Sequence, residues 1–175
     1  MAKEIWELWL ENLERRERDF QRYLRSKKIK REGEIKELVQ GHIDKADHNL
    51  KFVRLALGLK EFNDWAIVSA YYSIYHASLA LCALKGYSTK DHLATLLILI
   101  KDFYQKELNR EEIEMVSRVT IKKEEILYYI EAKTERKKAS YSTKILFDGK
   151  DAENLQGKAV GFVNRVKSIL DAAEL

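Results

Sequence analysis

The sequence contains no proline and only seven glycines among its 175 residues. Proline and glycine most often form turns and interrupt regular structure, so a β-rich fold with many turns is not expected. The abundant residues Leu, Ala, Glu and Lys all favour helices. Composition and length together predict an all-α fold with one compact core.

Cysteine is almost absent as well, since Cys82 is the only one. A single cysteine cannot form an internal disulfide, so nothing links the chain to an oxidising compartment. The first residues, Met1-Ala2-Lys3-Glu4, do not resemble a secretory signal, and charges interrupt the apolar runs before they could span a bilayer. We therefore expect a cytoplasmic protein that does not insert into a membrane.

The excess of positive charge is small, because 32 Lys and Arg face 28 Asp and Glu for a net charge of +4. That excess alone does not indicate a nucleic-acid partner. The cations are clustered, however, with nine of them against three anions between residues 14 and 31, and a second cluster at residues 133–144. Such clusters are typical of solvated helix faces, and a phosphate-binding surface is the alternative.

Apolar residues recur at helical spacing along almost the whole chain. The helices expected are 3–25, 34–57, 63–85, 88–108, 109–141 and 151–173, joined by a basic connector at 26–33 and a loop at 142–150. Short connections between long helices predict an up-and-down antiparallel helical bundle. Residues 1–30 form its N-terminal amphipathic helix and connector, and residues 31–175 form the bundle domain.

Two details of these helices can be checked directly. Ser88 with Asp91, and Asn109 with Glu112, have the spacing of capping boxes at helix starts. Trp6 and Trp9 lie on the apolar side of the first helix and pack either on the bundle or on a partner.

The expected helix 63–85 is the most apolar one, yet Ser69, Tyr72, Ser73 and His76 recur along it at steps of three and four. This spacing places all four on one face of the helix. A buried polar group without a hydrogen-bond partner costs about 1–3 kcal/mol, so each needs one. Either His76 bonds internally to Tyr72 or to a carbonyl of a neighbouring helix, or it points into a cleft or subunit interface.

The sequence lacks the motifs that several kinds of binding site and active site require. No glycine-rich phosphate loop and no glycine-framed serine elbow is present. No histidine follows a glutamate by three residues, and His42 and His48 are six apart, on different helix faces. We expect no metal site and no cofactor.

Residues 63–77, followed by Leu84-Lys85-Gly86-Tyr87 and His92, resemble the HEPN family of helical-bundle proteins, named for nucleotide binding in prokaryotes and higher eukaryotes. Residues 136–141, from Arg136 to Tyr141, resemble the Arg-Ala-Tyr region at the end of that family's long helix. The closing helix around Phe162 is also similar. The resemblance covers roughly residues 34–172 and implies a four-helix core to which the first helix is an addition.

The resemblance implies a homodimer, often encoded beside a minimal nucleotidyltransferase as a toxin–antitoxin pair. In active members an arginine and a histidine, with four to six residues between them, cleave RNA at the dimer cleft without a metal. His76 matches the histidine, but Ser69 stands where close relatives have the arginine. A serine cannot supply the permanent, bidentate charge of a guanidinium. Arg136, on another helix, is a candidate substitute.

The first hypothesis is therefore a homodimeric binding protein that partners a nucleotidyltransferase and binds nucleotide or RNA in its cleft. The residues expected to line that cleft are Ser69, Tyr72, Ser73, Arg136 and Tyr141. The alternative is a metal-independent RNase toxin, with His76 as the catalytic residue and a cation from elsewhere in the chain. A purely structural interaction protein, docking through its N-terminal tryptophans, is the third hypothesis. His92 is expected at the surface or at a helix cap, with a position facing the cleft as the alternative.

Overall fold

The computed structural model describes residues 3–59, 61–119 and 149–173. Its elements are helices α1 (Ile5–Glu11), α2 (Leu13–Arg25), α3 (Ile35–Gly58), α4 (Asn63–Leu84), α5 (His92–Asp102) and α7 (Gly149–Ala172), and strands β1 (Ile29–Arg31) and β2 (Tyr87–Thr89). Residues 110–119 are also helical. The predicted all-α helical bundle is confirmed.

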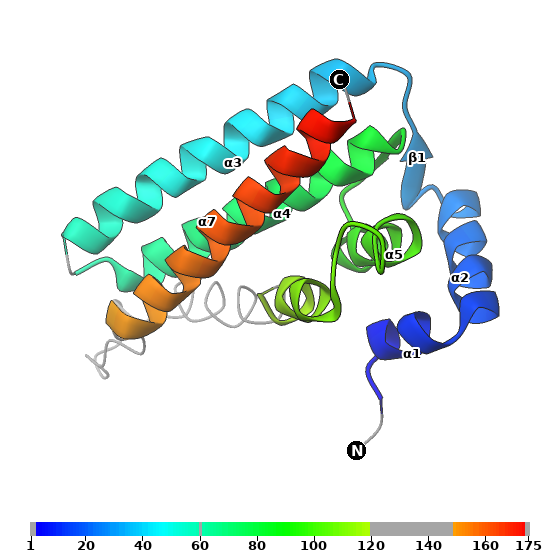
Figure 1. Cartoon of the computed structure of the whole chain (residues 1–175), viewed down its shortest axis with the longest axis horizontal. Helices are drawn as coiled ribbons and strands as arrows, with labels where there is room; N and C mark the ends of the chain where they lie inside the picture. The colour runs from blue at the N-terminus through cyan, green and yellow to red at the C-terminus, as the bar shows by residue number, and fades with distance from the viewer. Residues whose placement is uncertain (1–2, 60, 120–148, 174–175) are drawn as a thin grey trace, which may run out of the picture.

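Helix α4 is the centre of the bundle and packs against α3, α7 and α5. Figure 1 shows α3, α4 and α7 side by side along the long axis, with α3 running opposite to the other two. Fifteen of the 22 residues of α4 are buried. Contrary to the sequence expectation, α4 is long and apolar enough to cross a membrane, but 78% of its most apolar window is buried inside the protein, as in the core helix of a bundle.

Helix α5 lies across the bundle and is seen nearly end-on in Figure 1. It is shorter than the helix predicted over 88–108, and the predicted capping box of Ser88 and Asp91 was wrong. Ser88 belongs to β2, and its hydroxyl donates to the Glu32 carboxylate. Asp91 is itself the N-cap, and its carboxylate accepts from the Ala94 amide at 2.9 Å.

The predicted helix 3–25 is interrupted at Asn12. Asn12 ends α1 and caps α2, where its side-chain oxygen accepts from the Arg15 amide at 2.8 Å. Asparagine suits this position because its side chain replaces a missing helical hydrogen bond. Trp6 and Trp9 are both buried in the common core, and α1 and α2 pack on α5. Of the two predicted uses of the tryptophans, packing on the bundle is the one observed.

The basic connector contains a strand that sequence patterning missed. Strand β1 pairs antiparallel with β2, placing Ile29 opposite Thr89 and Arg31 opposite Tyr87. Three residues are too few for alternation to be recognised, and the pairing joins segments far apart in the sequence. Gly86, just after α4, has a φ of +75°, which glycine adopts without strain. The pair of strands fixes the end of α2 against the end of α4.

Of the remaining predicted helix boundaries, one is confirmed, one differs from the structure and one lies outside the described residues. The capping box of Asn109 and Glu112 is confirmed, since each backbone amide donates to the other's side chain, at 2.8 and 2.9 Å. Helix α7 begins at Gly149, inside the predicted loop 142–150. The predicted helix 109–141 is described only to residue 119.

Candidate functional site

The polar stripe of α4 divides into a buried part and an accessible part. Ser73 is fully buried and its hydroxyl donates to the Ser69 carbonyl oxygen at 3.0 Å, while Ser69 is only 7% exposed. Tyr72 is half-buried, with its ring edge-on to that of Tyr71 at 5.2 Å. Further along the stripe, His76 is half-buried and borders a surface hollow.

His76 contacts a histidine from the neighbouring helix. Its Nδ1 lies 3.2 Å from the Nδ1 of His42 on α3. The two rings stack with centroids 5.4 Å apart and planes inclined by 30°. The sequence had suggested Tyr72 or a backbone carbonyl as an internal partner, and the structure provides His42 instead.

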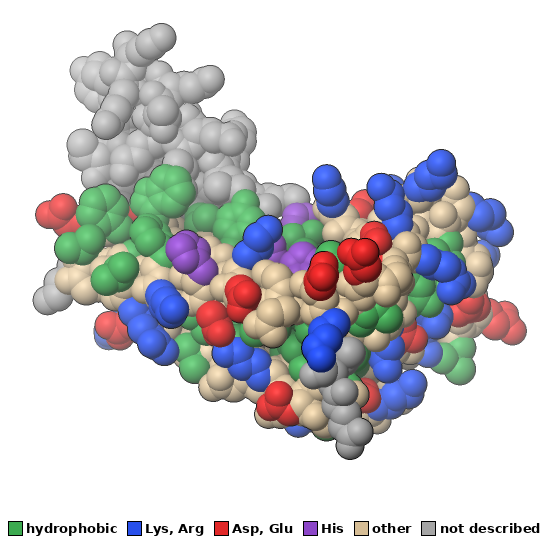
Figure 2. All heavy atoms as spheres, turned by 90° about the horizontal axis from the view of Figure 1, so that it is seen from above, with side chains coloured by type: hydrophobic (Ala, Val, Ile, Leu, Met, Phe, Trp, Pro, Cys, Tyr) green, Lys and Arg blue, Asp and Glu red, His purple; other side chains and the backbone are tan. Residues whose placement is uncertain are grey.

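The hollow that His76 borders has a volume of about 770 Å³. Three histidines line it: His42 from α3, His76 from α4 and His92 from α5. On the face shown in Figure 2, histidine side chains reach the surface next to lysine and arginine side chains. Ser69, Tyr72 and Ser73 are not among the described residues that line this hollow.

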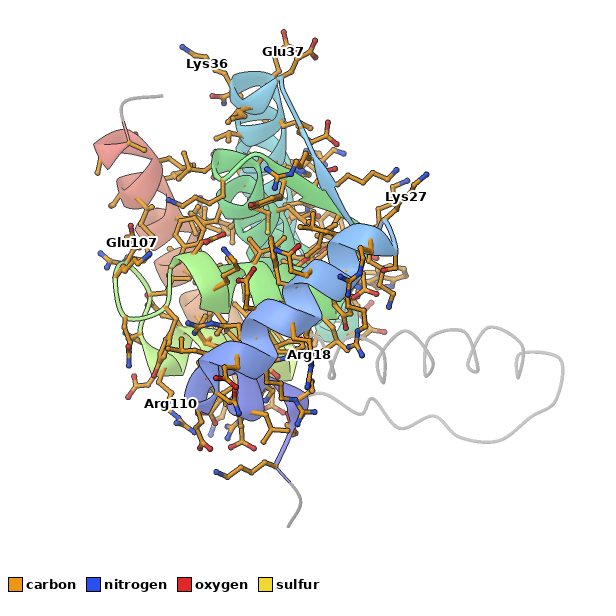
Figure 3. The ribbon with its side chains drawn as sticks, turned by 90° about the vertical axis from the view of Figure 1, so that its right-hand side faces the viewer. Arg18, Lys27, Lys36, Glu37, Glu107 and Arg110 are labelled. Atoms are coloured by element: carbon orange, nitrogen blue, oxygen red, sulfur yellow. The ribbon has the colours of Figure 1, made fainter. Side chains whose placement is uncertain are left out.

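Four lysines line the same hollow. Lys27 and Lys28 lie in the turn between α2 and β1, Lys30 lies in β1, and Lys90 follows β2. Figure 3 shows Lys27 extending outward from the turn between α2 and β1. The pairing of the two strands therefore brings cations from two distant segments to the histidines of α3 and α4.

One carboxylate, Asp91, also lines the hollow and is largely compensated. Its Oδ2 lies 2.8 Å from Lys28 Nζ. Burial works to raise the pKa of Asp91, but the hydrogen bonds from Lys28 and from the Ala94 amide hold that pKa below its usual value. Within the described residues, Lys27, Lys30 and Lys90 make no ion pair. The hollow therefore presents a net positive charge.

Both histidines of the pair are neutral at pH 7. Burial, followed by the nearby Lys45, lowers the pKa of His42. Burial, His42 and Lys45 together lower the pKa of His76 to about 4. A neutral imidazole has one N–H donor and one acceptor nitrogen. The site thus combines uncharged acid–base groups with fixed positive charges.

His92 was expected at the surface or at a helix cap, with the cleft as the alternative, and the structure places it among the residues that line the hollow. It is the first residue of α5, directly after the N-cap Asp91. Its Nδ1 lies 2.8 Å from the Tyr71 hydroxyl, and its ring packs against that of Tyr75 with centroids 4.4 Å apart. Burial raises the pKa of the Tyr75 hydroxyl, which stays protonated.

Sequence analysis missed His42, although a signal was present. His42 lies four residues after Leu38 and four before Ala46, both on the apolar side of α3. Helical spacing therefore turns it toward α4. The contribution of Lys30 and Lys90 had no comparable signal, because it depends on the pairing of two very short strands.

The basic cluster at residues 14–31 separates into two groups with different surroundings. Arg15, Arg18 and Arg22 lie within 4 Å of the buried Asp19 carboxylate, at 3.9, 3.9 and 3.4 Å. The lysines at the end of the cluster line the hollow. The cluster is therefore divided between arginines that pair with Asp19 and lysines that line the hollow.

Two predicted site residues, Arg136 and Tyr141, lie outside the described residues. In the part of the chain that is described, no group of three or more His, Cys, Asp or Glu side chains is placed to hold a metal ion. The three histidines of the hollow are held instead by one another and by tyrosines.

No protein-family model matches the sequence. The chain is 31% identical over 137 residues to a protein of Methanocaldococcus jannaschii named "Putative toxin MJ0605". The aligned region covers 78% of this chain and 92% of that protein. The similarity therefore extends over nearly the whole of the archaeal protein.

Proposed function

The chain belongs to the same family as this archaeal protein, and from that premise we propose that it is an HEPN-like protein of toxin type that binds RNA in the histidine-lined hollow. The observation that supports this most directly is the neutral pair His42 and His76 beside four lysines. Lysine ammonium groups bind phosphate oxygens, and uncharged imidazoles add donors without competing anionic charge. The relative's name fits such a role.

The size and shape of the hollow suit a nucleotide. Its volume of about 770 Å³ lies within the range of roughly 300–1,000 Å³ that is typical of small-molecule sites. The Tyr75 side chain lines it, with its ring packed on those of Tyr71 and His92. A single nucleotide, or one step of an RNA strand, is therefore the ligand we propose.

Binding can be measured by fluorescence anisotropy with a labelled single-stranded RNA, in the presence of EDTA. The double variant Lys30→Glu, Lys90→Glu should weaken binding at least tenfold and reduce the dependence of affinity on salt, because each phosphate contact releases counterions. Lys51→Glu, an exposed lysine of α3 that does not line the hollow, is the matched control. Equal loss in both variants would contradict a site in the hollow.

We also propose the cytoplasmic homodimer and the nucleotidyltransferase partner that the family resemblance implies, as one toxin–antitoxin-like pair. Exposed apolar side chains where α3 meets α4 support an association surface: Phe52, Leu55, Leu59, Phe62 and Trp65. Figure 2 shows apolar side chains gathered toward one end of the molecule.

Light scattering should give the mass of a dimer, and the product of an adjacent nucleotidyltransferase gene should co-purify. A monomer that captures no such partner would contradict this.

Metal-independent cleavage of RNA is the second candidate function, and the contact between His42 and His76 favours it. Imidazoles are the usual proton-transfer groups near neutral pH. The lysines of the hollow replace, from other segments, the arginine that is missing at Ser69. They provide the positive charge that a phosphorane transition state requires.

Purified protein incubated with RNA in EDTA tests this candidate. Cleavage should fall by about 10²–10⁴ in His76→Ala. It should persist in His48→Ala, because His48 is an exposed histidine of α3, the helix that contains His42. Folding of both variants is checked by circular dichroism. Cleavage that survives in the His76 variant would remove this function from the hollow.

A further inference from the structure

The contact between His42 and His76 joins the same nitrogen, Nδ1, of both rings at 3.2 Å. Between two neutral imidazoles such a contact is a hydrogen bond only if one Nδ1 has a hydrogen and the other has a lone pair. The ring that donates then has an unprotonated Nε2, and the ring that accepts has its hydrogen on Nε2. The pair therefore has one basic nitrogen and one N–H at its two far ends.

We infer that His42 and His76 act as a single proton relay on an RNA phosphodiester, rather than as two independent acid–base groups. The inference rests on the RNA cleavage proposed above. Both rings line the same hollow, so a bound phosphodiester can be reached from both. The relay is defined by the Nδ1–Nδ1 contact and needs no ionised histidine before or after the reaction.

Over one reaction the relay takes up one proton and releases one proton. The unprotonated Nε2 takes the proton of a ribose 2′-hydroxyl while the 2′-oxygen forms a bond to phosphorus. That ring gives its Nδ1 hydrogen to the Nδ1 of its partner, which releases its Nε2 hydrogen to the 5′-oxygen as the bond from phosphorus to that oxygen breaks. The products are a 2′,3′-cyclic phosphate and a 5′-hydroxyl, and the two rings have exchanged tautomers. Proton exchange with water restores the starting arrangement.

The surroundings keep the pair neutral. Lys45 on α3 opposes protonation of both rings, and burial acts in the same direction. The remaining charged or titratable groups near the pair lie on either side of it. On the side of the hollow they are the four lysines, the compensated Asp91, Tyr75 and His92. His42 also borders a second hollow, of about 610 Å³, with Glu32, Glu34, Glu37 and Lys45 along it.

The relay predicts a distinctive pH profile for cleavage. Two independent histidines, one protonated and one not, give a bell-shaped profile with a maximum near their ordinary pKa. A neutral relay loses activity only when the pair becomes protonated. Its rate should rise between about pH 4 and 6, as expected from the lowered pKa of His76, and then remain level to about pH 8.5.

The experiment is the pH–rate profile of the whole protein with a single-linkage RNA substrate in EDTA, under single-turnover conditions. Lys45→Gln removes a positive charge that opposes protonation, so it should move the acid limb to higher pH, whereas Lys51→Gln should leave it unchanged. His42→Ala, His76→Ala and the double variant should lose rate equally, since half a relay does not work.

Each result has a definite meaning. A rate that levels off above pH 6, together with equal losses in the single and double variants, supports the relay. A bell-shaped profile, or a larger loss in the double variant, overturns the relay and leaves RNA cleavage intact. Absence of cleavage at every pH overturns both the relay and the cleavage on which it rests.

Discussion

The imidazole of His76 makes stability depend on pH in a predictable direction. Its pKa in the folded protein is about 4, below the ordinary histidine value of 6.5, chiefly because burial disfavours the charged form. Between these pH values the unfolded chain binds more protons than the folded one. Protonation therefore favours unfolding, and stability falls as the pH is lowered from about 6.5 toward 4.

Substitution of His76 by glutamine, which does not titrate, should remove part of this dependence. A pKa unit corresponds to about 1.36 kcal/mol. Because His76 is partly exposed, solvent screening reduces its contribution to the pH dependence of stability to about 1–2 kcal/mol. Urea denaturation of both proteins at pH 7.5 and pH 4.5 measures the difference. Titrating groups that do not contact His76, including Asp91, are common to both proteins and cancel in this comparison. An identical loss of unfolding free energy between pH 7.5 and pH 4.5 in the two proteins would contradict the lowered pKa of His76.

A second residue-scale feature is the buried Asp19 carboxylate, which accepts from the Trp9 indole N–H at 2.8 Å. Asp19 is only 3% exposed, and three arginines of α2 surround it. The hydrogen bond connects α1 to α2 across the interruption at Asn12. It also explains why one anion lies inside a basic segment.

Replacement of Asp19 by alanine should lower the free energy of unfolding by about 1–3 kcal/mol, because the indole N–H of Trp9 is left buried without a partner. The control is Glu17→Ala, in the same helix but exposed, with an expected change below about 0.5 kcal/mol. Denaturation followed by tryptophan fluorescence reports on both. Equal effects would mean that the buried carboxylate has no special role.

At the scale of elements, the junction between α2 and β1 combines backbone strain with a position at the hollow. Lys27 has a φ of +59°, a conformation that costs a non-glycine residue roughly 1–2 kcal/mol. It occupies the position after the C-cap Ser26, where glycine is the usual residue. The same lysine lines the hollow, so its charge is the reason we propose for its presence.

Substitution of Lys27 by glycine should therefore raise the free energy of unfolding by about 0.5–1 kcal/mol and weaken RNA binding at the same time. Lys27→Arg retains both the charge and the strained backbone and should change neither property. Thermal denaturation and the anisotropy assay measure the two quantities on the same samples. A glycine variant with unchanged RNA affinity would contradict the role of Lys27 in binding.

The elements also show what the sequence could and could not predict. Helical periodicity identified α3, α4 and α7 because each is long and has an apolar side, and caps such as Asn109 are local signals. The interruption at Asn12 was missed because the apolar spacing continues through it and only the cap geometry reveals the break. The strands β1 and β2 were missed because their pairing is not local.

At the scale of the whole molecule, the site is a product of the fold. Residues of α3, α4 and α5 provide the histidines, and the paired strands bring lysines to them from two distant segments, residues 27–30 and Lys90. The sequence predicted His76 because it follows a polar stripe on one helix. The sequence could not predict that His42 is the partner of His76, because helical spacing places a residue on a face of its helix but does not identify the residues that pack against that face.

The central claim is that RNA binds where His42 and His76 meet. The most direct test is an NMR spectrum that correlates the imidazole nitrogens with their ring protons, recorded while a single-stranded RNA oligonucleotide is added at pH 7. The signals of His42 and His76 should shift together in proportion to the RNA bound. The signals of His48, which is exposed on the same helix as His42, should not shift. Saturation of the protein with RNA while the signals of His42 and His76 remain unchanged would contradict the account.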